Sequence, residues 1–146
     1  MSTVESGRLG SVRHLFVLAA AIEAVAGLTL LAAPAVVLRM VFGPAGDTFP
    51  AAGIARLAGA ALLSFAAACW WARHEERSET SKALVGAMLI YNIAVVALCV
   101  AGSLGAVGPL QWAAVALHGA LSIWCAWVLA NGIPAATARA SDNSTS

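Results

Sequence analysis

Four long apolar runs alternate with short polar segments along this chain of 146 residues. Each run has about the 20 residues that an α-helix needs to cross the hydrocarbon core of a bilayer. The pattern predicts membrane-spanning helices at residues 13–33, 51–72, 82–102 and 109–130. The first run is too long for the apolar part of a cleaved signal peptide. We therefore expect an all-α fold, a bundle of four transmembrane helices.

The connection between the first and second spans, from Ala33 to Pro50, is too long for a tight turn. Its segment from Pro34 to Phe42 has a proline suited to a helix N-terminus. We expect a short amphipathic segment there, on the outer leaflet or capping the bundle; an ordered loop is the alternative. The expected domains are an N-terminal tail at 1–12, the membrane domain at 13–131 and a C-terminal tail at 132–146. The polar stretches 1–11 and 135–146 are expected to be disordered.

The composition agrees with the pattern, since 61% of the residues are hydrophobic and 10% are charged. Such values are typical of membrane proteins. The N-terminus, the second loop and the C-terminal tail hold most of the basic residues, whereas Arg39 falls on the opposite side. This bias predicts that both termini are cytoplasmic. Tryptophans near the same ends of the second and fourth spans are placed as in an interfacial aromatic belt.

Each span carries one strongly polar residue: Glu23, Arg56, Asn92 and His118. At about 1.5 Å per residue, the first, third and fourth of these lie close to the membrane midplane. Arg56 lies only about five residues from the outer end of its span, so its guanidinium either snorkels outward or bends towards Glu23. Ionisable groups in a membrane normally face the protein interior and mark a site. We expect these side chains to converge in a buried polar pocket.

The helical faces are expected to follow the same arrangement. The fourth span has one polar stripe, made of Gln111, His118, Ser122 and Cys125. The second span has a stripe of small and polar residues, made of Arg56, Ala60, Ser64 and Ala67. On the third span Asn92 shares a face with Met88 and Cys99, and Tyr91 is adjacent. We expect these stripes to meet in the bundle core.

A mostly apolar site with a few convergent polar groups is typical of small-molecule binding. The leading hypothesis is a pocket for a lipophilic molecule, such as a quinone, an isoprenoid or a lipid. In an enzymatic extension Glu23 and His118 are the catalytic acid and base of an isomerase, cyclase or hydrolase. The expected substrate-binding residues are Arg56, Asn92, Tyr91, Gln111 and Ser122. Structural roles remain as alternatives: a Glu23–Arg56 ion pair that fixes helix register, and an interhelical hydrogen bond from Asn92.

No motif for a metal, haem, nucleotide or iron–sulfur cluster is present, and we expect no cofactor. The three cysteines all lie within spans and form no C-x-x-C pair. That spacing argues against a zinc site and against a thiol–disulfide oxidoreductase. A net charge of +1 gives no reason to expect a nucleic-acid partner.

The chain from His14 to Asn131 resembles the DoxX-like group of small bacterial four-helix membrane proteins. The residues that carry the resemblance are Glu23, the stretch from Leu31-Ala32-Ala33-Pro34 to Phe42-Gly43, Ala55-Arg56-Leu57-Ala58-Gly59-Ala60, Trp71-Ala72-Arg73, Tyr91-Asn92 and His118-Gly119. The resemblance implies a multi-pass protein of the bacterial cytoplasmic membrane. Many members of this group have no assigned activity, so it informs the fold more than the function.

Two further functions remain open. The segment Ala21-Ile22-Glu23-Ala24-Val25-Ala26-Gly27 is similar to the first span of small multidrug resistance transporters, which carries an essential glutamate. That resemblance implies a dimer that exchanges protons for a cationic substrate. This chain departs from it in the long first external connection, the arginine of the second span and the third span. The other alternative is an accessory or assembly subunit of a larger membrane complex.

Overall fold

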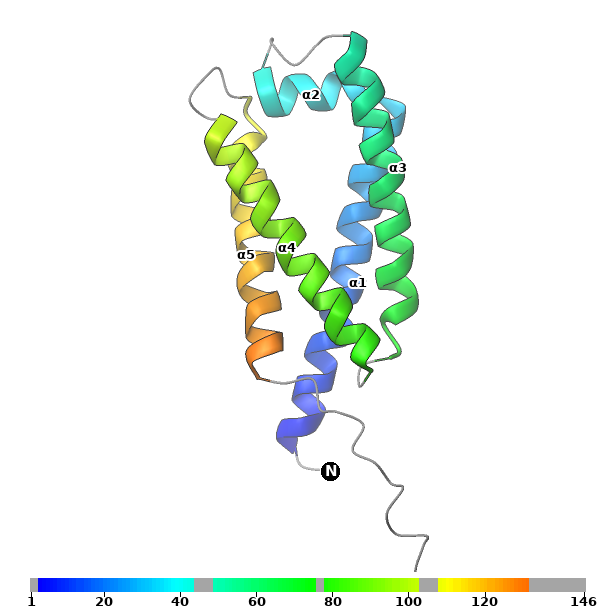
Figure 1. Cartoon of the computed structure of the whole chain (residues 1–146), viewed down its shortest axis with the longest axis vertical. Helices are drawn as coiled ribbons and strands as arrows, with labels where there is room; N and C mark the ends of the chain where they lie inside the picture. Colours follow the sequence, from blue (N-terminus) through cyan, green and yellow to red (C-terminus); the bar gives the residue numbers. More distant parts are fainter. Residues whose placement is uncertain (1–2, 44–48, 76–77, 103–107, 132–146) are drawn as a thin grey trace, which may run out of the picture.

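The computed structural model describes residues 3–43, 49–75, 78–102 and 108–131. These residues form five α-helices and no strand (Figure 1). The helices are α1 (Thr3–Ala32), α2 (Pro34–Phe42), α3 (Phe49–Ala72), α4 (Glu79–Gly102) and α5 (Gln111–Ala130). Four are long and stand side by side, whereas α2 lies across one end of the bundle (Figure 1).

The four long helices contain segments that are long and apolar enough to cross a membrane. These segments are Ser11–Ala32, Pro50–Ala72, Glu79–Ala101 and Gln111–Ala130. The predicted spans agree with them to within three residues, the largest difference being between residue 82 and Glu79. The all-α, four-span prediction is confirmed, and the chain is a multi-pass integral membrane protein.

The first helix begins earlier than the sequence analysis expects. Residues 3–11 continue α1 as helix, so the expectation of a disordered stretch at 1–11 is wrong for these residues. Extending a helix that has already formed adds one hydrogen bond per residue without a new nucleation cost. No proline interrupts this segment. Residues 1–2 and the expected C-terminal tail at 132–146 lie outside the described residues.

The short helix expected between the first two spans is α2, and it is held at both of its ends. Pro34 occupies its first turn, where a missing N–H costs nothing. At its other end, the N–H groups of Gly108 and Leu110 donate to the carbonyl oxygens of Val41 and Met40, at 3.0 and 2.9 Å. A Cβ atom on Gly108 would lie 2.0 Å from the Met40 oxygen, so only glycine fits there. Backbone hydrogen bonds therefore fasten α2 to the segment that precedes α5.

The long helices associate as two pairs. Helix α1 packs along α3 and α4 packs along α5, whereas contact between the two pairs is sparse. In the first pair, a Cβ on Gly27 would lie 2.7 Å from the Gly59 carbonyl oxygen. A Cβ on Gly59 would lie 2.8 Å from the Gly27 oxygen. The two backbones thus meet directly, as small residues allow membrane helices to do.

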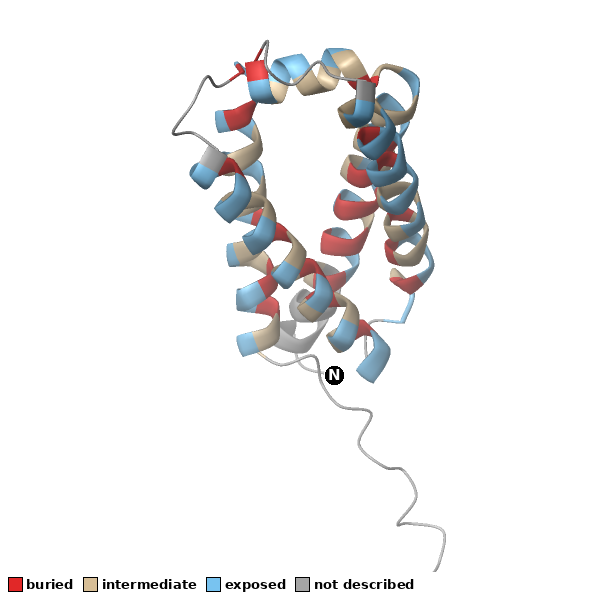
Figure 2. Ribbon diagram, turned by 45° about the horizontal axis from the view of Figure 1, so that its top comes forward, coloured by how far each residue is buried: buried red, intermediate tan, exposed pale blue. Residues whose placement is uncertain are grey.

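The hydrophobic core occupies only one half of the bundle. Its members come from the N-terminal parts of α1 and α4 and the C-terminal parts of α3 and α5: Val12, Leu15, Phe16, Ala19, Ala20, Cys69, Ala72, Val85, Met88, Leu121, Cys125 and Val128. We call this end the packed half and the end that carries α2 the open half. Buried positions lie mainly on the helix sides that face the bundle interior (Figure 2).

One predicted helix face is wrong. Arg56, Ala60 and Ser64 of the second span are exposed, so this stripe does not meet the core. The buried positions of α3 include Ala55 and Gly59 instead. The Ser64 hydroxyl donates to the Ala60 carbonyl oxygen at 3.1 Å, which satisfies it within its own helix. Close approach to α1 selects the glycine face, and the serine needs no interior position.

The glycine contact between α1 and α3 gives a first prediction. Replacing Gly27 or Gly59 with Ala forces a methyl group against a backbone carbonyl, which should destabilise the protein by about 1–3 kcal/mol. The matched control is Gly53→Ala on α3, where an added Cβ meets nothing within 4 Å. Because alanine favours helices over glycine, the control should be neutral or stabilising. Unfolding in mixed micelles measures the free energy of unfolding of each variant. Equal stability of Gly59→Ala and Gly53→Ala would contradict the close contact.

Candidate functional site

Four polar or aromatic side chains meet near the boundary between the packed and the open half. They are Glu23 from α1, Tyr91 and Asn92 from α4, and His118 from α5. We call them the polar centre. Glu23 and Asn92 are only 3% and 2% exposed. The prediction that Glu23, Asn92 and His118 converge at one depth is confirmed.

The Asn92 and His118 side chains form a short hydrogen bond. His118 Nδ1 lies 2.6 Å from Asn92 Oδ1, and Asn92 Nδ2 donates to the Met88 carbonyl oxygen at 2.7 Å. That carbonyl can only accept, so the amide must turn its oxygen towards the imidazole. His118 therefore carries its proton on Nδ1. Its Nε2 has no hydrogen-bond partner among the described residues and keeps its lone pair in the neutral ring.

Tyr91 connects the two sides of the polar centre. Its hydroxyl donates to Glu23 Oε2 at 3.4 Å, which is long for a hydrogen bond between two oxygen atoms. The ring packs at a tilt against Phe65 and edge-to-face against His118, with centroid distances of 5.8 and 5.6 Å. The position of the ring is thus fixed by its neighbours, and its hydroxyl is only weakly engaged. A phenol can donate one hydrogen bond and accept another, so Tyr91 can also serve a ligand.

Two other predicted binding residues lie outside the polar centre. Gln111 is 1% exposed at the start of α5, and its Nε2 donates to the Cys99 carbonyl oxygen. That bond joins α5 to α4 in the open half. The Ser122 hydroxyl donates to the His118 carbonyl oxygen at 2.8 Å within α5. Both residues face inward as expected, but neither approaches Glu23 by a described hydrogen bond.

Arg56 is exposed, and no ion pair joins it to Glu23 in the part of the chain that the structure describes. The register of α1 against α3 explains the separation. Glu23 lies four residues before Gly27, and Arg56 lies three residues before Gly59 on the antiparallel helix. The two side chains therefore lie on opposite sides of the glycine contact, about 10 Å apart along the bundle axis. The predicted role of Arg56 in binding stays a prediction that this geometry does not favour.

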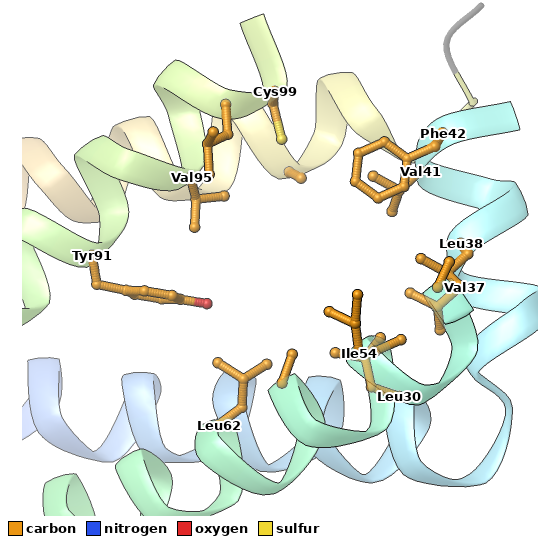
Figure 3. Close-up of a pocket in the computed structure, with 15 residues that line it drawn as sticks. Leu30, Val37, Leu38, Val41, Phe42, Ile54, Leu62, Tyr91, Val95 and Cys99 are labelled. Atoms are coloured by element: carbon orange, nitrogen blue, oxygen red, sulfur yellow. The ribbon is translucent and has the colours of Figure 1, made fainter. Parts of the chain in front are cut away.

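An apolar cavity of about 500 Å³ extends from Tyr91 to α2. We call it the main cavity. Fifteen of the residues that the structure describes, from all five helices, line it, and the Tyr91 hydroxyl points into it (Figure 3). Val37, Leu38, Val41 and Phe42 of α2 close the far end. Apart from the Cys99 thiol, Tyr91 supplies the only hydrogen-bonding side chain among the described lining residues.

A second apolar cavity, of about 520 Å³, lies on the other side of α1. Its lining includes Ala21, Val25 and Thr29 of α1 and Leu110 before α5. Leu30 and Val37 line both cavities and so form the partition between them. Apolar space thus lies on both sides of Leu30 and Val37 in the open half.

The residues that shape the cavities could not be recognised from the sequence pattern. Leu30, Val37, Leu62 and Val95 are ordinary aliphatic residues in apolar runs, and nothing distinguishes them there from lipid-facing positions. Gly59 had a detectable signal, because glycine within a span often marks close helix approach. The inward stripe of the fourth span is confirmed, since Gln111 and Cys125 are buried.

The chain has no significant match to any protein-family model, curated protein or solved structure. Its assignment as a four-pass membrane protein rests on its own helices.

The Asn92–His118 bond gives a second prediction. In a double-mutant cycle with Asn92→Ala and His118→Ala, we expect a coupling free energy of about 1 kcal/mol, because each single change leaves the other polar group buried without its partner. Ser64→Ala is the control, because its exposed hydroxyl bonds only within its own helix. Unfolding in mixed micelles gives the free energy of unfolding of all five proteins: the wild type, the two single variants, the double variant and the control. Additive effects at Asn92 and His118 would show that the bond contributes nothing.

Proposed function

We propose that this protein binds a lipophilic small molecule in the main cavity, with the polar group of that molecule at Tyr91. The observation that carries the proposal is the Tyr91 hydroxyl at the inner end of an apolar cavity, hydrogen-bonded to the buried carboxyl of Glu23. Cavities of roughly 300–1,000 Å³ with few polar groups are typical ligand sites. A retained glutamate in a membrane core is costly unless it has a use.

The polar centre also supports acid–base chemistry. A protonated Glu23 can donate to the Tyr91 oxygen while the Tyr91 hydroxyl donates to a ligand, so that a proton passes through Tyr91. The lone pair on His118 Nε2 is the candidate base. An isomerase, cyclase or hydrolase that acts on an apolar substrate would use such a pair. Of Glu23, Tyr91 and His118, Tyr91 is the residue that lines the main cavity, so a proton from Glu23 would reach a substrate there through Tyr91.

The arrangement favours a pocket over the two alternatives. A proton-coupled transporter must expose Glu23 to both sides, yet the side chains of the packed half, such as Phe16 and Met88, lie between it and one end of the bundle. An accessory subunit would turn its polar stripes towards a partner, yet Asn92 and His118 bond to each other within the chain. The proposal also includes a DoxX-like protein of the bacterial cytoplasmic membrane, which the residue motifs support. It includes cytoplasmic termini, which the distribution of basic residues supports.

Filling the cavity tests the proposal. Ala58 lines the main cavity, whereas Ala60 is exposed on another side of the same helix. Native mass spectra of wild-type protein released from nanodiscs should show an adduct of a few hundred daltons. Ala58→Phe should lose most of that adduct and Ala60→Phe should retain it, since the added ring occupies the cavity only in the first.

The carboxyl is tested separately. Glu23→Gln should weaken the adduct several-fold while helicity is retained, because Tyr91 then loses its ionisable partner. A wild-type protein without any adduct, or an adduct that survives Ala58→Phe unchanged, would contradict binding in this cavity.

A further inference from the structure

We infer that the ligand is an uncharged lipophile that lies inverted relative to a membrane lipid, with its one polar group at the bilayer midplane and its apolar body towards α2. The inference rests on the proposed function and specifies its ligand class. It follows from the direction in which polarity changes along the main cavity.

The polar end of the cavity is the deep end. Tyr91 lies twelve residues after Glu79 in a helix of 24 residues, hence near its middle. At about 1.5 Å per residue, its hydroxyl lies roughly 15 Å below the end of the bundle. Glu23, its partner, lies nine residues before the end of the first span at Ala32. A ligand that satisfies Tyr91 must therefore place its polar group near the membrane centre.

The shallow end of the cavity is apolar. Helix α2 turns Val37, Leu38, Val41 and Phe42 inward, whereas Arg39 is exposed on its outer side. A phospholipid keeps its headgroup at the interface and its chains at the centre, which is the reverse of this lining. A headgroup seated beneath α2 would face four apolar side chains and lose its water.

The lining also selects against charge. Moving an ionised group into an apolar site costs far more than one hydrogen bond returns, unless a counter-ion is present. No Lys or Arg is among the described residues that line the main cavity. At the deep end the Tyr91 phenol lines the cavity, whereas Glu23 bonds to that phenol and is not a lining residue. Glu23 therefore offers no direct counter-ion to a cationic ligand, and in its ionised form it would repel an anionic one. Alcohols, phenols and ketones meet both conditions.

The cavity opens sideways, which suits a ligand that arrives from the bilayer. Ile54 of α3 and Leu98 of α4 both line the cavity and are 69% and 72% exposed. The opening thus lies between α3 and α4, where the two helix pairs have few contacts. A volume of about 500 Å³ holds on the order of 15 non-hydrogen atoms, if each takes roughly the volume of a water molecule. A dodecyl chain with one small polar group is of that size.

Photolabelling in phosphatidylcholine nanodiscs tests orientation and charge together. The probes are two dodecanol derivatives, one with a diazirine beside the hydroxyl and one with a diazirine at the far end of the chain. After illumination, labelled peptides are mapped by mass spectrometry. We expect the first probe to label α4 around Tyr91 and the second to label α2 between Val37 and Phe42. Unlabelled dodecanol should compete, and laurate and dodecylphosphocholine should compete at least tenfold less well.

Variants and competitors distinguish the orientation and charge of the ligand from the proposed binding itself. Tyr91→Phe should reduce competition by dodecanol about fivefold and leave competition by dodecane unchanged, because one hydrogen bond is lost. Labelling that saturates but follows the reverse pattern, or laurate that competes as well as dodecanol, would overturn the inverted, uncharged ligand and leave a ligand site in place. Labelling that neither saturates nor responds to Ala58→Phe would overturn both.

Discussion

The direct backbone contact between Gly27 and Gly59 is the constraint on which the rest of the structure depends. It brings α1 and α3 together as one wall and fixes their register. That register leaves Arg56 on the outside and Glu23 one turn below the contact, within reach of Tyr91 on α4. With α1 committed to α3, helices α4 and α5 form a second wall. The two walls meet closely only in the packed half, where large side chains such as Phe16 and Met88 fill the interior.

The open half is much less densely packed than the packed half. Its walls carry small or separated aliphatic side chains, and α2 spans the gap rather than filling it. In water such a space would collapse, because apolar surface is driven together. In a bilayer that drive is absent, since lipid chains are as apolar as the helices, and packing and hydrogen bonds decide instead. The backbone hydrogen bonds from Gly108 and Leu110 to α2 are therefore important, because they hold α2 in place across the end of both helix pairs.

Much of this architecture could be predicted from the sequence, because a membrane limits what a helix can do. Run length gives the spans, and helical rise places Glu23, Asn92 and His118 at one level. The rotation of each helix is less determined. The second span offers a stripe through Arg56 and Ser64 and another through Gly59, and only the contact with α1 chooses between them. Cavities depend on how two walls diverge, which no local pattern of aliphatic residues encodes. Tyr91 is among the binding residues expected from the sequence, and its position at the end of the main cavity follows from packing against Phe65 and His118.

The central claim is that the bundle is packed at one end and held apart at the other around Tyr91. Methyl-selective NMR of the full chain in nanodiscs tests it most directly. The account predicts cross-peaks between the methyl groups of Leu15 and Val85, two buried core residues that come from different helix pairs in the packed half. It predicts none between Leu62 and Val95 across the main cavity, where each should instead show cross-peaks to alkyl protons of a bound molecule. Direct cross-peaks between Leu62 and Val95, with no alkyl contacts, would show that the open half is closed and would contradict the account.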